Sequence, residues 1–195
     1  MEMIAPRQQW PLSEIAVITR CPDLSDLVAH FLYDQHTPNA ERSGAHIDIS
    51  QCPNKFMGKV YSYTSAIATF YAPSDLSRAG GMYRQCIHAS PSWHNGPKRY
   101  DCVYVERDHT LSGFQGLFVA KVLHFFDFEF RNRYYPCALV HWFDSIGDQP
   151  CPNTGMWMVQ PEYNGEGEPT FGLYHAISSF DCHLWYYTYS KGLTL

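Results

Sequence analysis

The chain has 195 residues, a formal net charge of −5, 17% charged side chains and 16% aromatic residues. This length suits one domain, and the aromatic content favours β structure over helix. The negative net charge argues against generic nucleic-acid binding, which relies on Lys and Arg to displace counterions from phosphate. No apolar window approaches the length of a membrane-spanning helix, so we expect no membrane span.

The seven cysteines contain no C-x-x-C pair, and the first residues contain no apolar core of signal-peptide length. An odd number of cysteines without a signal peptide is typical of free thiols in a reducing compartment. We therefore expect an intracellular protein.

Residues 1–58 are expected to form an N-terminal arm with one strong element, a helix over about 23–34. Residues 1–21 show no clear period and predict an irregular lead-in, whereas residues 34–58 are rich in turn formers and predict a loop. We expect the helix to cap the β-rich part of the chain, because its apolar side chains recur along a single face. These are Leu24, Leu27, Val28, Phe31 and Leu32.

Residues 59–175 predict a β-rich module, with strands expected over 59–72, 100–107 and 156–159. Its centre is residues 116–143, where two apolar runs flank a short polar link. This is the pattern of a β-hairpin with a loop of three to five residues. In the first run the even-numbered positions from Phe118 to Phe130 are almost all apolar. We expect the even set to face a core and the odd set to emerge into water near the turn.

Together these elements predict a mainly β fold of the α+β class. The arrangement expected is a small bent sheet or partly open barrel, capped by the N-terminal helix. Residues 176–195 carry an aromatic run without a clear period. We treat them as an atypical tail for which no structure is predicted.

Several motifs resemble, in the same order, the C-terminal region of fungal Plavaka-type transposon proteins. They are residues 23–35, 70–77, 80–82, 91–93, 100–105, 135–143, Asp148 and 154–159. In that family a DDE-type nuclease domain with an RNase H-like fold precedes this region. The resemblance therefore implies a non-catalytic part without its nuclease domain, and it ends where the atypical tail begins.

A second set of motifs resembles a bromo-adjacent-homology (BAH) domain. It comprises residues 101–105, 119–122 and 139–143. Such domains are β-rich modules of chromatin proteins that contact histone tails and other proteins. This resemblance implies a BAH-like barrel, a protein or chromatin partner and a nuclear location, by analogy at the level of the fold.

No catalytic pattern stands out along the chain. The Cys and His residues lack the paired spacing of a structural zinc site, and the acidic residues fall mostly where strands meet turns. Neither a nucleophile elbow nor a phosphate-binding loop is present. We therefore expect no enzyme activity, no cofactor and no metal.

Two candidate binding surfaces remain. Tyr104, Trp142 and Trp157 could line an aromatic groove or cage for a methylated lysine, which binds aromatic faces by cation–π attraction. The same residues also suit a core. Arg131 and Arg133 could contact phosphate from a hairpin tip, or serve as a solubilising turn.

The leading hypothesis is a non-enzymatic, transposon-derived fragment that acts in protein or chromatin interaction. One alternative is an accessory DNA-binding domain of a transposase. The other is a decayed gene product without a selected function.

Overall fold

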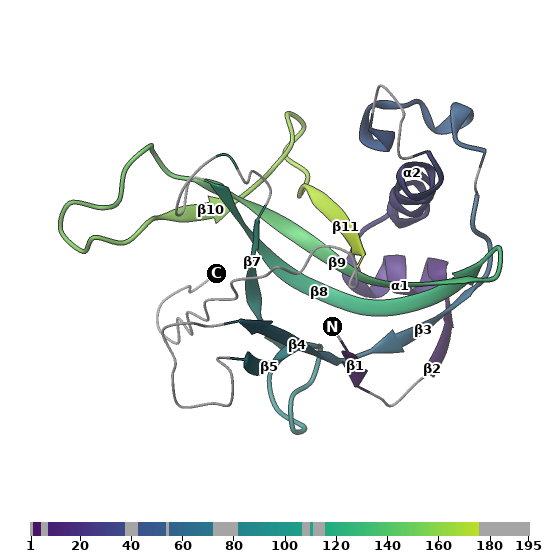
Figure 1. Cartoon of the computed structure of the whole chain (residues 1–195), viewed down its shortest axis with the longest axis horizontal. Helices are drawn as coiled ribbons and strands as arrows, with labels where there is room; N and C mark the ends of the chain where they lie inside the picture. Colours follow the sequence, from purple (N-terminus) through teal and green to yellow (C-terminus); the bar gives the residue numbers. More distant parts are fainter. Residues whose placement is uncertain are drawn as a thin grey trace.

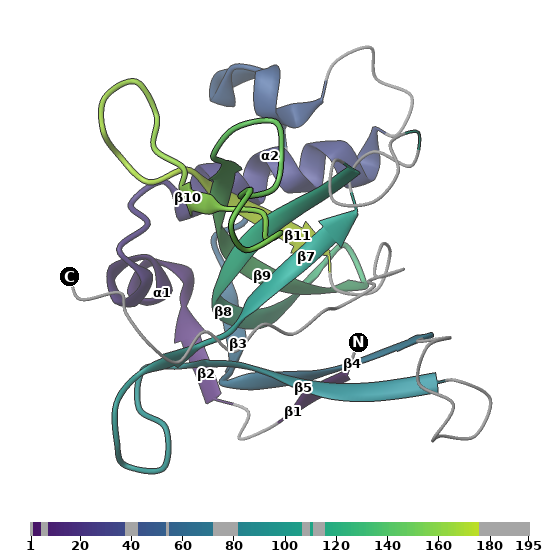
Figure 2. The same cartoon turned by 90° about the vertical axis from the view of Figure 1, so that its left-hand side faces the viewer.

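The computed structural model describes residues 2–4, 8–37, 43–53, 55–71, 82–106, 110 and 116–175. Within them the chain forms three layers: a small antiparallel sheet, a larger antiparallel sheet, and two helices (Figures 1 and 2). The fold is mainly β, as predicted, and both sheets are open, so the described strands close no barrel. The tail 176–195 lies outside the described residues.

The strand order defines the two sheets. The large sheet runs β10 (Val159–Pro161), β9 (Arg133–Ser145), β8 (Leu117–Phe130), β3 (Lys59–Tyr63) and β2 (Gln8–Pro11), with β11 (Phe171–His175) also on β9 and β7 (Cys102–Glu106) also on β8. The small sheet runs β1 (Glu2–Ile4), β4 (Ser65–Tyr71), β5 (Met82–Ser90) and β6 (Arg99–Tyr100).

Two segments among the described residues pass directly from one sheet to the other. β3 bends at Thr64 into β4, so the region predicted as strand over 59–72 forms, through residue 71, two strands with a bend. β6 leads through Asp101 into β7. The backbone of Asp101 joins the layers, because its N–H donates to His88 O (2.9 Å) and its carbonyl accepts from Val122 N (3.0 Å). Strands that change sheet in this way form the corners of packed sheets.

The even-numbered residues of β8 do not all face the same core. The ladder with β9 shifts register between Val122 and His124. Before the shift, Val122 points into the core between the two sheets; after it, Phe125 does so, whereas Phe126 packs beneath the helices. A bulge adds one residue to a strand and so exchanges its two faces beyond that point. Simple alternation along the sequence does not reveal this exchange.

The hairpin turn is shorter than predicted. β8 ends at Phe130 and β9 begins at Arg133, and these two residues pair directly. The loop is therefore only Arg131 and Asn132, with φ of 52° and 60°. Two successive positive φ angles are the conformation of the tight I′ turn, whose twist matches that of the flanking strands.

The predicted helix is α2 (Leu24–His36), and its buried residues pack against the large sheet around Phe126 and Phe128. The prediction of an irregular lead-in over residues 1–21 was wrong, because residues 8–19 form β2 and α1 (Leu12–Thr19). α1 buries only Leu12 and Ile15, so its period is too short to recognise. The arm also contributes one strand to each sheet, because β2 pairs with β3 and β1 pairs with β4.

Two short 3-10 turns, η1 (Gly44–His46) and η2 (Ile49–Gln51), occupy part of the predicted loop. In the described part of the chain, neither α1 nor α2 has the length and apolar character needed to cross a membrane.

Candidate binding site

The structure separates two of the three predicted aromatic residues. Tyr104 pairs with Val119 of β8, whereas Trp142 pairs with the next residue, Ala120. Directly opposed residues share a face of the sheet and neighbours along a strand do not. Tyr104 and Trp142 therefore lie on opposite faces and cannot line one cage. The Trp142 ring packs on the core between the sheets, with its centroid 5.4 Å from that of Tyr174.

The third residue, Trp157, lies half-buried in the loop 146–158. The strand predicted over 156–159 is present only from Val159 onward. The preceding residues instead close the loop, because Ile146 N donates to Met158 O and Cys151 N donates to Met156 O, both at 2.8 Å. These bonds hold the loop in a defined shape.

Aromatic rings surround His141 on the helix-side face of the large sheet. The His141 ring centroid lies 5.9 Å from that of Phe143 and 5.8 Å from those of Tyr163 and Phe171. Its Nε2 donates to Glu162 O at 3.0 Å. Tyr163 is 55% exposed, so this cluster reaches from the helix-side core to the surface.

Carboxylates gather at the same end of the sheet. Residues 134–175 contain no Lys or Arg and five acids, of which all but the half-buried Glu162 are exposed: Asp144, Asp148, Glu162, Glu166 and Glu168. Three large apolar side chains of the loop 146–158 are also exposed there: Ile146 (42%), Met156 (45%) and Met158 (47%). We call residues 143–171 the acidic end.

Both loops of the acidic end are anchored on β9. β10 pairs with Phe143–Ser145, and the turn 162–170 is tied to the strand by Glu162 N donating to Trp142 O at 2.9 Å. At its tip, Asn164 Oδ1 accepts from the backbone N–H groups of Glu166 and Glu168, both at 2.9 Å. Figure 1 shows the loop between β9 and β10 projecting from the end of the sheet away from α1, and the turn between β10 and β11 projecting as a separate loop. The surface is therefore preorganised.

The predicted phosphate contacts lie at the other end of the β8–β9 ladder. Arg131 lies in the hairpin turn and Arg133 directly follows it, close to the C-terminal end of α2. Burial lowers the pKa of His36 there, and the positive charges of Arg131 and Arg133 lower it further. His36 Nε2 lies 3.3 Å from the Tyr135 hydroxyl. The large sheet thus carries a basic tip and an acidic end.

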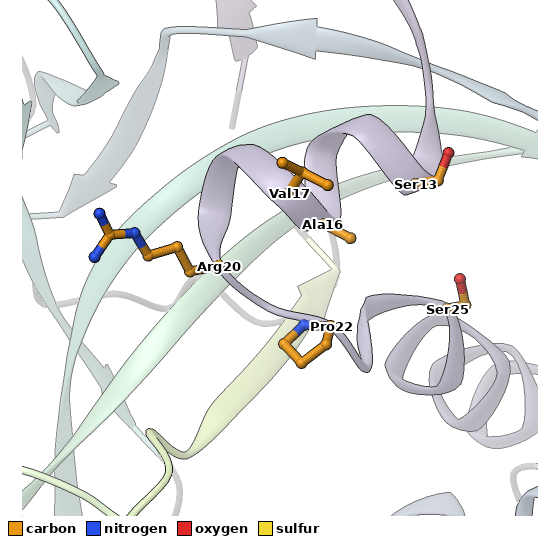
Figure 3. A pocket seen from close by; sticks show the side chains of 6 residues that line it. All are labelled: Ser13, Ala16, Val17, Arg20, Pro22 and Ser25. Atoms are coloured by element: carbon orange, nitrogen blue, oxygen red, sulfur yellow. The ribbon is translucent and has the colours of Figure 1, made fainter.

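Neither metal binding nor catalysis is indicated at these surfaces. Within the described ranges, no group of three or more His, Cys, Asp or Glu side chains could hold a metal ion. A shallow depression at the turn between α1 and α2 (Figure 3) is lined by Ser13, Ala16, Val17, Arg20, Pro22 and Ser25. Arg20 is the one charged residue of that lining, so the depression contains no acid–base pair.

Comparison of the chain with family models, with curated proteins and with solved structures finds no match. Function is therefore inferred from the chain's own surfaces. The acidic end was not predicted as a site, although one signal was visible in the sequence: a stretch of 42 residues (134–175) without any Lys or Arg.

Proposed function

We propose that this chain is a non-enzymatic protein-interaction module that binds a basic segment of a partner protein at the acidic end. The observation that carries the proposal is the coincidence of five carboxylates with exposed apolar side chains on one anchored surface. A Lys- or Arg-rich peptide matches both features, since its charged groups meet the carboxylates and its aliphatic stems cover apolar surface.

The exposed side chains suit such a partner. Met156 and Met158 are flexible and polarisable, a property of surfaces that adapt to different peptides. Tyr163 offers an aromatic face to a cation, an interaction worth about 0.5–1 kcal/mol at an exposed site. The surface is also charged enough to speed association and to disfavour acidic partners.

The resemblances are consistent with this proposal. BAH modules contact histone tails, which are rich in Lys and Arg, so a chromatin partner would have the required chemistry. A transposon origin would account for a module without its own nuclease. Both points support the proposal as analogies and add no contact of their own.

The test is a titration of the full chain with a fluorescein-labelled 15-residue Lys/Arg-rich peptide, followed by anisotropy at two salt concentrations. We expect binding that weakens with salt, because exposed charges are screened. Reversing two charges by Glu166→Lys with Glu168→Lys should weaken binding by about tenfold, close to 1.4 kcal/mol.

A matched control changes the net charge equally elsewhere. Glu14→Lys with Glu129→Lys alters exposed acids on α1 and near the hairpin tip and should change affinity by less than about twofold. Met156→Ser with Met158→Ser should weaken binding at both salt concentrations, since that contribution is apolar. Equal losses in the two charge variants, or no binding at low salt, would refute the proposed site.

The same titration, repeated with duplex DNA in place of the peptide, tests the DNA-binding alternative. Duplex DNA that binds more tightly than the peptide, and loses affinity when Arg131 and Arg133 are replaced by Ala, would assign function to the basic tip instead.

A further inference from the structure

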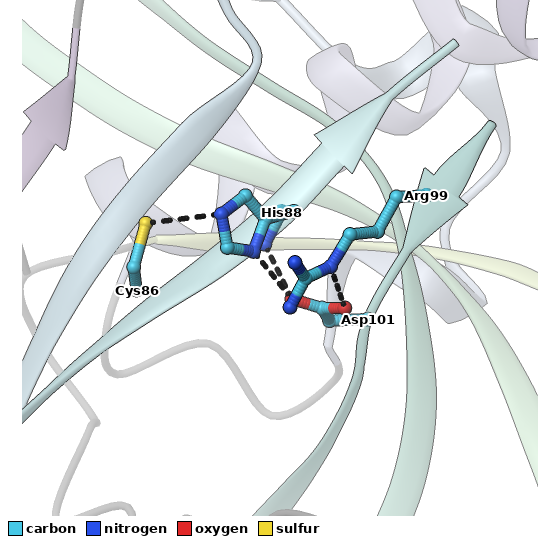
Figure 4. Close-up of polar contacts among 4 residues, drawn as sticks. All are labelled: Cys86, His88, Arg99 and Asp101. Atoms are coloured by element: carbon cyan, nitrogen blue, oxygen red, sulfur yellow. Dashed lines mark hydrogen bonds and ion pairs between the residues drawn. The ribbon is translucent and has the colours of Figure 1, made fainter. Parts of the chain in front are cut away.

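A Cys–His–Asp arrangement lies on the outer face of the small sheet. Cys86 and His88 are two residues apart in β5, so they share a face, and the intervening Ile87 is buried in the core between the sheets. Asp101 approaches the same face from the corner between β6 and β7. Figure 4 shows Cys86, His88 and Asp101 linked in that order, with Arg99 joined to the same carboxylate.

The contacts connect the three side chains in sequence. Cys86 Sγ lies 3.5 Å from His88 Nε2, and His88 Nδ1 lies 2.8 Å from Asp101 Oδ2. Asp101 Oδ2 also accepts from the backbone N–H of His88 at 2.8 Å, and Oδ1 accepts from Arg99 Nε at 3.1 Å. Burial favours the neutral form of Asp101, but the donors from His88 and Arg99 outweigh it and hold the pKa of its carboxyl below the usual value.

These contacts fix the tautomer of His88. An ionised Asp101 has no proton to donate, so Nδ1 of His88 must carry the hydrogen of the 2.8 Å bond. In the neutral imidazole Nε2 is then an acceptor, and it faces the Cys86 thiol. A nucleophile within reach of a base, with the base oriented by a third group, is the geometry of an activated side chain.

Trp93 and Arg99 cover the ring of His88 and help to hold it in place. The Trp93 ring lies edge-on at a centroid distance of 4.1 Å, and the Arg99 guanidinium lies over Trp93 at 4.9 Å. The loop carrying Trp93 is closed by Trp93 N donating to Pro97 O at 3.1 Å. His88 and Asp101 are buried beneath this cover, whereas Cys86 is only half-buried.

We propose that Cys86 is a nucleophilic thiol, with His88 as its base and Asp101 as a positioning residue, at a site for covalent modification by small carbon electrophiles. With an α-haloamide the sulfur attacks the methylene carbon, the S–C bond forms and the carbon–halogen bond breaks. Halide leaves with the bonding electrons. The thiol proton passes to Nε2 of His88 and from there to water.

The electrostatic surroundings define how the thiol reacts. Desolvation raises the pKa of Cys86; the hydrogen bond with Ser65 and the charge of Arg99 oppose this, whereas Asp101 adds to it. Arg84 and Glu2 form an exposed ion pair at 2.9 Å further along this face. The thiol therefore keeps its proton at neutral pH, and sulfur becomes nucleophilic when the proton moves to His88.

This mechanism predicts a distinctive pH profile for alkylation at Cys86. While the Cys86–His88 pair holds one proton, the fraction with that proton on His88 does not depend on pH. The experiment treats the full-length chain with iodoacetamide from pH 5 to 10 and measures the rate at each cysteine by peptide mass spectrometry. We expect the rate at Cys86 to rise with pH clearly less steeply than the tenfold per pH unit of an isolated thiol.

His88→Gln removes the base but retains a polar side chain. Its rate at Cys86 should be at least tenfold lower at pH 7 and should rise about tenfold per pH unit, as for an isolated thiol. Cys151, on the loop 146–158, is the internal reference and should react at the same rate in both proteins. Cys86→Ser assigns the labelled site.

Asp101→Asn keeps an acceptor for Nδ1–H and removes the negative charge that stabilises a protonated His88. We expect the shallow pH dependence to persist at a severalfold lower rate, and an unchanged rate would remove Asp101 from the proposal. The pH profile of the wild-type chain tests the role of His88 even where a variant does not fold. A rate at Cys86 that climbs tenfold per pH unit from pH 7 would show that His88 and Asp101 only join the sheets.

Discussion

Phe125 and Phe126 are consecutive residues of β8, yet their side chains fill two different cores. Phe125 is 1% exposed and packs between the two sheets, whereas Phe126 is fully buried beneath α1 and α2. The large sheet is therefore covered on both faces along this part of β8. Substitution of Phe125 therefore probes the packing between the two sheets, and substitution of Phe126 probes the packing of the helices on the large sheet.

We expect Phe125→Ala and Phe126→Ala each to lower the free energy of unfolding by about 3–5 kcal/mol, because each removes a buried ring and leaves a cavity. Tyr134→Ala is the control: Tyr134 is 59% exposed, and its loss should change stability by less than about 0.5 kcal/mol. Urea denaturation measures all three. A small effect at only one Phe would show that its layer is not packed as described.

Local patterns predicted the elements whose signal lies within a few residues. The stripe of α2 and the apolar runs of β8 and β9 were recognisable because burial follows the period of each element. β1 and β2 were missed because they are ordered by pairing with β4 and β3, more than 45 residues away in the chain. The bulge at Leu123 was missed because alternation reveals one face of a strand but not an exchange of faces.

The candidate sites show the same limit. Tyr104 and Trp142 were grouped by residue type, and only the strand register reveals that they lie on opposite faces. The spacing of Cys86 and His88 indicates a shared face once β5 is known to be a strand. Their link to Asp101 depends on the corner between the sheets, which no local pattern encodes.

The hairpin turn predicts a stabilising substitution. Arg131 adopts φ of 52° and Asn132 φ of 60°, and the left-handed region costs most residues about 1–2 kcal/mol. Replacing Arg131-Asn132 by Asn-Gly, the preferred pair for this turn, should raise the free energy of unfolding by about 1 kcal/mol. Arg133→Asn, in the adjoining strand, should give no gain. Thermal unfolding measures both variants. A lower unfolding temperature for the Asn-Gly variant would contradict the I′ conformation of the turn.

Gly172 tests the contact between β11 and β9. A Cβ at this position would collide with the indole Nε1 of Trp142. We expect Gly172→Ala to lower stability by about 1–3 kcal/mol, as overpacking does. Gly165→Ala is the control, since a Cβ there meets nothing within 4 Å. Urea denaturation followed by tryptophan fluorescence measures both, and equal stabilities would show that Trp142 can move aside.

His124 makes stability depend on pH. Its ring is buried, with Nε2 2.8 Å from the Ser62 hydroxyl, and burial lowers its pKa from 6.5 to about 4. Between these values the unfolded chain binds a proton that the folded chain does not, so stability falls as the pH falls from 6.5 to 4. The loss is about 3 kcal/mol in total, at about 1.4 kcal/mol per pH unit.

His36 and His175 also have lowered pKa values and act in the same direction. The comparison is therefore with His124→Gln, which cannot titrate, by urea denaturation at pH 7.5, 6, 5 and 4.5. We expect the difference in unfolding free energy between the wild type and His124→Gln to shrink as the pH falls. A difference that stays constant would show that His124 binds its proton equally well in the folded and the unfolded chain.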